Sequence, residues 1–230
     1  MESIFRRQEV KFVVTDAQHS QVYDIVAQHV PSHTFGKYLV QSLYFDTDHW
    51  DVICTSIDKP LFKEKMRLRC YGVPTLHSTM YLELKKKYRG IVHKRRIAFP
   101  MSELERKTVR DIAAADATQV GRELNFYLQS IPVYERVHIS YGRTAFEDDS
   151  GLRITFDTNI RFRTNMLDYN HPEGGQPILP PGLTVIEVKT LGGIPMWLAR
   201  ALSEFGIYPV SFSKYGAGYK KYIANKGDRE

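Results

Sequence analysis

The chain has 230 residues, with 32 Lys and Arg against 26 Asp and Glu, so its formal charge is +6. This length permits one sizeable domain, and 43% hydrophobic residues exclude a disordered or collagen-like chain. No stretch reaches the roughly 18 apolar residues of a membrane span, and the amino terminus lacks an apolar signal core, so we expect a cytoplasmic protein without a transmembrane segment. Cys54 and Cys70 are too few for a zinc cluster or a disulfide scaffold and are predicted to be buried thiols.

Helices are predicted from caps and from apolar residues that recur on one face. Thr15 and Gln18 have the spacing of a capping box, and Pro31 ends the helix that follows. The predicted helices cover Thr15–Val30, Ser102–Ala115, Ala117–Leu128 and Pro195–Phe205, and a short one follows Ser213.

Strand-like segments make up most of the remaining chain, at residues 7–14, 39–46, 65–72, 79–88, 91–99, 134–146, 152–163 and 183–190. About eight long strands with helices between them predict an α+β fold, in which an antiparallel β-barrel closes or nearly closes. Four prolines and three glycines in Asp168–Gly182 predict a long surface loop. Because strands of one pattern lie on both sides of this loop, we expect a single domain over residues 1–230.

Successive side chains of a strand point to opposite faces, so each strand divides into two sets. In one set of the segment 65–71 the residues are Lys65, Arg67, Arg69 and Tyr71, whereas the other set is apolar and must face a core. An ordinary solvated face is also polar, but it mixes Glu, Thr, Ser and Gln with Lys. Here the polar sets are mostly Arg and Lys, and the same pattern recurs on most of the other strands.

Such a face would be unstable inside a barrel without counter-ions. Unit charges ~6 Å apart repel by roughly 3 kcal/mol per pair at an effective dielectric of ~20. Arg suits phosphate because its planar fork binds two oxygens at once. The sequence therefore predicts a basic tunnel that holds a polyanion.

Isolated glutamates lie among these cations. Glu9, Glu83 and Glu187 each lie two positions from a lysine on the same strand face. Mg²⁺ and Mn²⁺ bind through one or two carboxylates together with substrate phosphates, so these residues are candidate metal ligands. The alternative is that each is an ordinary Glu–Lys neighbour pair. The sequence contains no glycine-rich phosphate loop, nucleophile-elbow serine or zinc-protease motif.

Nine segments in order along the chain together resemble the VTC domain, the polyphosphate polymerase domain of the vacuolar transporter chaperone complex, in its free-standing bacterial form. They are Arg7–Phe12, Tyr44–Thr47, Arg67–Arg69, Glu83–Lys85, Lys94–Arg96, Tyr141–Phe146, Arg153–Thr158, Val185–Lys189 and Phe212–Tyr215. The resemblance implies a triphosphate tunnel metalloenzyme of the CYTH-like superfamily. In that superfamily the basic tunnel of an antiparallel β-barrel binds ATP and polyphosphate with a divalent metal.

The resemblance also implies a role for each matching residue. Seven cations are expected to act in catalysis as phosphate ligands: Arg67, Arg69, Lys85, Lys94, Arg143, Arg153 and Lys214. Phosphate or nucleotide binding is expected of Lys11, Tyr141 and Ser213, and strand alternation adds Arg96. Glu187 would be the metal carboxylate, with Glu9 and Glu83 as further candidates.

Two positions depart from the wider family pattern. Arg7 stands where triphosphatases and adenylate-cyclase-like members carry the first carboxylate of a Glu-x-Glu-x-Lys motif. This change favours phosphate binding over the delivery of a water, and so a polymerase over a hydrolase. Lys87 stands where fungal relatives carry a histidine. The membrane helices and the regulatory SPX domain of the fungal proteins are not expected here, and association with a separate membrane protein is a possible partner interaction.

The expected function is that of an ATP-dependent polyphosphate polymerase, which uses Mn²⁺ or Mg²⁺ and releases ADP. Its ligands would be ATP and polyphosphate or pyrophosphate. The alternatives are a tripolyphosphate or nucleoside-triphosphate hydrolase and a non-catalytic polyphosphate-binding domain. Nucleic acid is not an expected partner, because base stacking needs exposed aromatics among the cations, and most Tyr and Phe alternate onto the apolar faces.

Overall fold

The computed structural model describes residues 8–89 and 91–224, without the side chains of 32–35, so Arg7 lies outside the described residues. Its strands are β1 (Gln8–Thr15), β2 (Ser32–Asp46), β3 (Phe62–Tyr71), β4 (Thr79–Tyr88), β5 (Ile91–Pro100), β6 (Tyr134–Glu147), β7 (Arg153–Arg163), β8 (Gln176–Pro177) and β9 (Leu183–Thr190). They form one sheet in the order β1-β9-β7-β6-β2-β3-β4-β5, with β8 paired to β7.

The predicted α+β class with an antiparallel sheet is confirmed. A closed barrel is not formed: within residues 8–89 and 91–224, β1 pairs only with β9 and β5 only with β4, so the sheet has two open ends. No helix in this part of the chain is long and apolar enough to cross a membrane.

The chain divides into two compact units. Unit 1 comprises residues 1–39, 141–160 and 177–213, and unit 2 comprises 40–140, 161–176 and 214–230. The long strands β2, β6 and β7 contribute residues to both units. The expected single domain over 1–230 remains a prediction, and each unit is described by itself.

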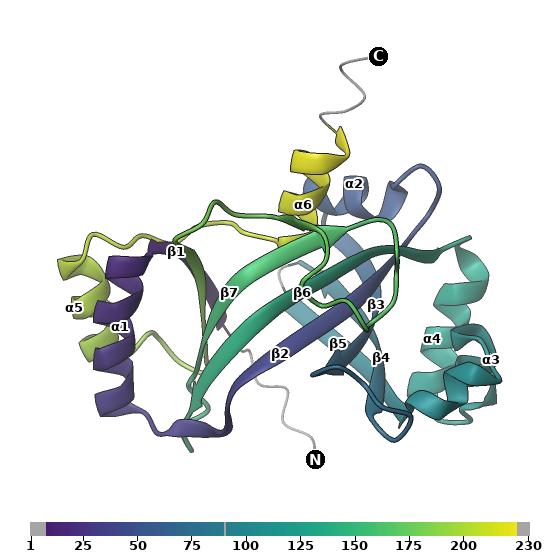
Figure 1. Ribbon diagram of the computed structural model, residues 1–230, viewed down its shortest axis with the longest axis horizontal. Coiled ribbons are helices and arrows are strands. Elements are labelled where there is room, and N and C mark those ends of the chain that lie inside the picture. The colour runs from purple at the N-terminus through teal and green to yellow at the C-terminus, as the bar shows by residue number, and fades with distance from the viewer. Residues whose placement is uncertain (1–7, 90, 225–230) are drawn as a thin grey trace. The chain divides into compact units, whose positions relative to one another are not determined.

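Unit 1 is built on β1 and β9, with helices α1 (Asp16–His29) and α5 (Met196–Glu204) side by side (Figure 1). The predicted capping box is present, since the hydroxyl of Thr15 accepts from the Gln18 backbone N–H and the Gln18 side chain accepts from the Thr15 backbone. The apolar strand residues and helix residues share one core, which includes Phe12, Val22 and Leu198.

Unit 2 is built on the β3-β4-β5 meander, which packs on a core shared with α3 (Val109–Ala115) and α4 (Gln119–Ser130). Figure 1 shows these two helices beside each other. Helices α2 (Asp51–Ile57) and α6 (Lys214–Tyr222) are linked by Asp46. The buried Asp46 carboxylate accepts from the backbone N–H groups of Val52 and Ile53 and from the Tyr215 hydroxyl at 2.6 Å.

One helix prediction in unit 2 is wrong, and one helix was not predicted. The expected helix over Ser102–Ala115 is a 3-10 helix at Met101–Glu105 followed by α3, because Thr108 caps a new helix with Asp111. Helix α2 was not predicted. Its N-cap is Trp50 in a left-handed conformation, and its first backbone N–H groups are satisfied by a carboxylate outside the helix.

The segment Asp168–Gly182 was expected to be a surface loop, but part of it is anchored. Arg163 is only 4% exposed, and its guanidinium donates to the backbone carbonyls of Met166, Asp168 and His171. Tyr169 is buried and donates its hydroxyl to the Leu68 carbonyl at 3.0 Å. The segment also contains β8. Arg163 therefore satisfies the Asp168 and His171 carbonyls of this segment, which a count of proline and glycine does not predict.

The two cysteines also differ from one another. Cys70 is fully buried, as predicted, whereas Cys54 is partly exposed. The Cys54 thiol donates to the Tyr219 hydroxyl at 3.2 Å, so its position at the α2–α6 contact keeps it nearer the surface than expected.

Candidate functional site

Unit 2 carries a cationic face on β3, β4 and β5, opposite its apolar core. The register places side chains in rows across the three strands: Lys63, Lys87 and Val92; Lys65, Lys85 and Lys94; Arg67, Glu83 and Arg96; Arg69, Tyr81 and Ala98. We call the charged members of these rows the unit 2 face. Of the residues described on these strands, eight cations and one carboxylate belong to this face.

The sheet fixes this face because the alternate set of each strand is buried. Met66, Leu68, Leu82, Leu84 and Ile97 all lie in the unit 2 core. A slip of one residue in the strand pairing would turn every cation into that core. Burial of the apolar side chains therefore fixes which charged side chains lie opposite one another. The predicted alternation of these strands is confirmed.

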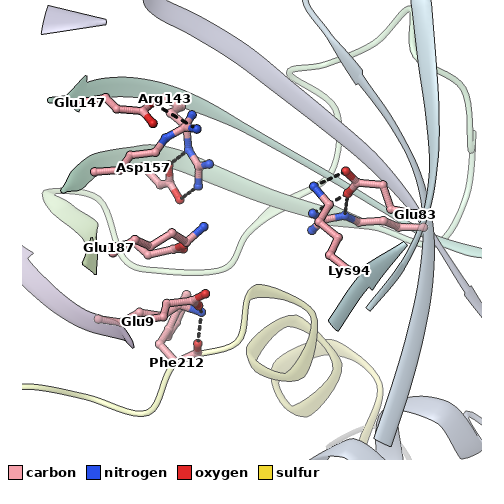
Figure 2. Close-up of polar contacts among 12 residues, drawn as sticks. Glu9, Glu83, Lys94, Arg143, Glu147, Asp157, Glu187 and Phe212 are labelled. Atoms are coloured by element: carbon pink, nitrogen blue, oxygen red, sulfur yellow. Dashed lines mark hydrogen bonds and ion pairs between the residues drawn. The ribbon is translucent and has the colours of Figure 1, made fainter. Parts of the chain in front are cut away.

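Glu83 is the centre of the unit 2 face (Figure 2). Its carboxylate is almost fully buried, and its Oε2 accepts from Nε and Nη2 of Arg67, both at 2.7 Å. Its Oε1 lies 2.5 Å from Nζ of Lys94 and 3.9 Å from Nη1 of Arg96. Because both oxygens face cations, Glu83 organises the cluster, and a metal ion there would have to displace those cations.

The charges of this cluster shift one another's pKa values. Burial opposes ionisation of Glu83, but Arg67, Arg69 and Lys94 lower its pKa to about 2. Burial lowers the pKa of Lys94 to about 8, although Glu83 acts in the opposite direction. Perturbed pKa values of this kind are frequent where charged ligands bind.

Tyr44 is a member of this site that the sequence analysis did not name. It lies opposite Arg67 in the β2–β3 register and accepts a hydrogen bond from the Nη1 of that residue at 3.1 Å. Burial raises the pKa of the phenol, but Arg67 and Arg69 outweigh this effect and bring it to about 8. Ser42 lies opposite Arg69 and accepts from its Nε at 3.1 Å. Strand alternation along 39–46 could have predicted this, because Ser42 and Tyr44 are two positions apart and lie on the same face of the strand.

Unit 1 carries a second polar face on β1, β9, β7 and β6, which we call the unit 1 face. Its register rows are Glu9, Lys189 and Arg153, and then Lys11, Glu187 and Thr155. With Asp157, Arg143 and Glu147, the described residues of this face comprise four cations and four carboxylates. The expectation of a mostly basic face is therefore wrong for this unit.

Arg143 and Asp157 form the most buried ion pair of the unit 1 face (Figure 2). Nε and Nη2 of Arg143 donate to the two carboxylate oxygens at 2.6 and 2.7 Å. Burial would lower the pKa of Arg143, but Tyr141 and Asp157 raise it well above its usual value. The guanidinium also lies 5.2 Å from the centre of the buried Tyr141 ring. This geometry gives Arg143 a fixed position with two of its nitrogens already bonded.

The remaining unit 1 cations each have an acidic neighbour. Nζ of Lys11 lies 3.1 Å from Glu9 and donates to the Phe212 carbonyl at 3.1 Å (Figure 2). Nη1 of Arg153 lies 3.6 Å from Glu147. These pairs hold the face together without an external ion.

A divalent metal fits the row that contains Glu187. That carboxylate is 6% exposed and its Oε1 lies 2.6 Å from Lys189. Thr155, opposite Glu187, is 3% exposed and its hydroxyl oxygen has no hydrogen-bond partner. Oxygen ligands of this kind suit Mg²⁺ or Mn²⁺, with substrate oxygens completing the shell. Among the described residues no group of three or more His, Cys, Asp or Glu side chains could hold a metal alone.

The other predicted site residues lie as follows. Lys85, in the central row of the unit 2 face, is exposed. Ser213 is exposed, and Lys214 is the first residue of α6. Roles for all the predicted site residues remain predictions.

Comparison with known proteins places the chain in a family. A sequence profile of the VTC domain matches residues 6–223. The chain belongs to the VTC domain family. No curated protein sequence matched it.

One solved structure shows the same fold at low identity. A putative adenylyl cyclase from Hippeastrum, described as having a dominant triphosphatase activity, superposes with a TM-score of 0.55 at 15% identity, over 94% of this chain and 96% of that one. A protein from Pyrococcus horikoshii OT3 has a TM-score of 0.42 at 14% identity, over 86% of each chain.

Proposed function

We propose that this VTC domain protein is an ATP-dependent polyphosphate polymerase. Its unit 2 face would bind the phosphates of ATP and of the growing polymer, and its unit 1 face would hold a divalent metal through Glu187, with Glu9 as a second ligand. Membership of the VTC domain family supports an activity on polyphosphate or triphosphate.

The observation that carries the proposal is the length and charge of the unit 2 face. From Arg69 to Lys63 it extends over about 20 Å at 3.3 Å per residue. That is longer than the three phosphates of a nucleotide, and the row of Lys65, Lys85 and Lys94 has no carboxylate in register with it. A chain of phosphates neutralises such a face along its whole length.

The chemistry of extension also suits these residues. A terminal oxygen of the polymer attacks the γ-phosphorus of ATP, and the bond to the β–γ bridging oxygen breaks, so that ADP leaves. Because the attacking oxygen is already ionised, this step requires no general base. What it requires is alignment and neutralisation of charge, which Arg67, Arg69 and Lys94 can supply.

A nucleoside-triphosphate or tripolyphosphate hydrolase is the second candidate. Two carboxylates, Glu9 and Glu187, lie on paired strands of the unit 1 face, and a metal there could lower the pKa of a bound water. The Hippeastrum protein, which has the same fold, is described as having a dominant triphosphatase activity, and this supports the second candidate.

One assay separates the two candidates. The protein is incubated with ATP and Mn²⁺, and long-chain polyphosphate, ADP and free phosphate are measured together. A polymerase forms polymer and ADP with little free phosphate, whereas equal amounts of ADP and free phosphate without polymer would overturn the proposal. The Arg69→Ala variant should lose polymer formation by at least about 100-fold. Lys107→Ala, which removes an exposed cation that pairs with Glu103 outside the unit 2 face, is the matched control.

A further inference from the structure

The free end of the β3-β4-β5 meander carries an exposed apolar cluster. Phe62, Tyr88 and Ile91 are cross-strand neighbours in one register row. They are 49%, 48% and 45% exposed. Val92, 45% exposed, lies on the opposite face of β5 in the row of Lys63 and Lys87, and Leu61, 70% exposed, precedes β3. We call these five residues, which lie on both faces of the free end of the meander, the meander tip. Five exposed large apolar side chains at one end of a sheet are an unusual surface for a protein that meets only water.

The helix cover of the sheet stops short of this row. Glu123 of α4 pairs with Lys86 at 3.4 Å and with Arg95 at 3.2 Å. Lys86 lies two residues before Tyr88, in the preceding row of the same face, so the apolar row lies beyond these two ion pairs with α4. The apolar row therefore continues the core face of the sheet beyond its last covered position.

Cations surround the meander tip. Residues 58–65 and 85–95, which flank it in the sequence, contain nine Lys and Arg against two acidic residues, Asp58 and Glu64. One of the two, Glu64, lies 3.4 Å from Lys86. The guanidinium of Arg89 lies 5.4 Å from the centre of the Tyr88 ring. Lysine and arginine stems can lie along apolar surface while their charged ends reach a polar layer.

We propose that the meander tip is a membrane-docking surface, which inserts its apolar side chains into the interfacial layer of an anionic lipid bilayer. The proposal goes beyond the proposed enzyme activity and does not depend on it. Aromatic residues prefer the interface of a bilayer, and apolar burial combined with electrostatic attraction gives reversible binding. The excess of cations around the tip complements anionic headgroups, which attract each basic residue near the surface.

The test is co-sedimentation of the full chain with lipid vesicles. Vesicles of phosphatidylcholine alone are compared with vesicles that also contain phosphatidylglycerol. We expect binding to the anionic vesicles only, weakened by added salt. The double variant Phe62→Ser/Ile91→Ser should lose at least about tenfold in vesicle affinity, whereas Phe126→Ser, which removes a 70% exposed apolar side chain from α4, should bind normally. Melting temperatures establish that each variant is folded.

A second set of variants tests the electrostatic contribution and changes exposed cations outside the unit 2 face. Lys59→Gln and Arg89→Gln should each weaken anionic vesicle binding about fivefold, the change that ~1 kcal/mol per basic residue corresponds to. Three results would overturn the proposal: no binding to anionic vesicles, equal binding by Phe62→Ser/Ile91→Ser, or a self-associating protein that the double variant makes monomeric without any vesicle binding. The second would indicate a site for soluble polyanions, and the third an interface between copies of this chain.

Discussion

The two polar faces are built by the same strand alternation, yet they differ in their balance of charge. The described residues of the unit 2 face comprise eight cations and one carboxylate, Glu83, whereas those of the unit 1 face comprise four cations and four carboxylates. Alternation decides which side chains share a face. The partners that each charge meets there decide whether the face needs an external ion.

This difference assigns different tasks to the two faces. In unit 1 the charges satisfy one another, as in the bidentate contact of Arg143 with Asp157, so the face is pre-organised before any ligand binds. In unit 2 the cations outnumber their partner, and their mutual repulsion falls when a polyanion binds. Binding energy from phosphates is therefore expected to stabilise unit 2 more than unit 1.

The largest effect is expected from Glu83→Gln, which removes the single carboxylate of the unit 2 face. Loss of this buried partner of Arg67 and Lys94 leaves several cations close together without compensation. Breaking a buried ion pair in this way costs about 3–5 kcal/mol of stability. Thermal or denaturant unfolding measures the loss, and added tripolyphosphate should recover a large share of it.

Glu123→Gln is the control for this experiment. Its carboxylate pairs with two cations on the helix-covered side of the same strands but is more exposed, so the variant should lose less than about 1 kcal/mol. Unchanged stability of Glu83→Gln, or recovery that is equal for both variants, would show that Glu83 does not hold the cluster together.

Much of this architecture follows from the sequence. The apolar halves of the strands, such as Met66 and Leu68, predicted the buried face because a period of two is readable over a short segment. The capping box at Thr15 is local, so its two residues predicted a helix start without any tertiary information. The candidate cations on β3, β4 and β5 were found for the same reason.

Other features depend on contacts between distant residues. The strand register brings Glu83 to Arg67 and Lys94. It also brings Asp157 to Arg143. Alternation within each strand does not specify this register. Helix α2 is short, and its first turn is capped from outside by a buried carboxylate. Arg163 satisfies the carbonyls of a proline-rich segment that resembles an open loop in the sequence. In each case one side chain from another segment of the chain makes the contact, so the pattern within a single segment does not predict it.

A smaller effect, of about 100-fold on activity, is expected from Glu187→Gln in the unit 1 face. The change removes the charge of the proposed metal ligand but keeps its shape. Titration of Mn²⁺ followed by electron paramagnetic resonance should show weaker metal binding, while metal-free affinity for polyphosphate stays within about twofold. Glu147→Gln, at another carboxylate of the same face, should retain metal binding. If Glu187→Gln binds Mn²⁺ as the unaltered chain does, the metal role belongs elsewhere.

The smallest effect concerns pH and the unit 2 face alone. Burial lowers the pKa of Lys94 to about 8. Burial raises the pKa of Tyr44, but Arg67 and Arg69 together have the larger effect and lower it to about 8. As pH rises from 7 to 9, Lys94 loses a positive charge and Tyr44 gains a negative one, so the face becomes less positive by two charges. The γ-phosphate of ATP changes its charge little in this range, since the last pKa of such a terminal phosphate is about 6. Affinity for ATP should therefore fall about tenfold between pH 7 and pH 9, a change of ~1.4 kcal/mol.

Two variants identify the groups responsible for this pH dependence. Lys94→Arg keeps a cation beside Glu83 that does not titrate below pH 12, and Tyr44→Phe removes the phenol that accepts from Arg67. Each should remove part of the pH dependence, and the double variant should bind ATP almost equally at both pH values. Calorimetry at constant ionic strength measures these affinities, because salt screens the same charges. A double variant that retains the full tenfold change in affinity would place the titrating groups outside the unit 2 face. The pH dependence would then have to come from other groups, such as those of the unit 1 face, whose cations already have carboxylate partners.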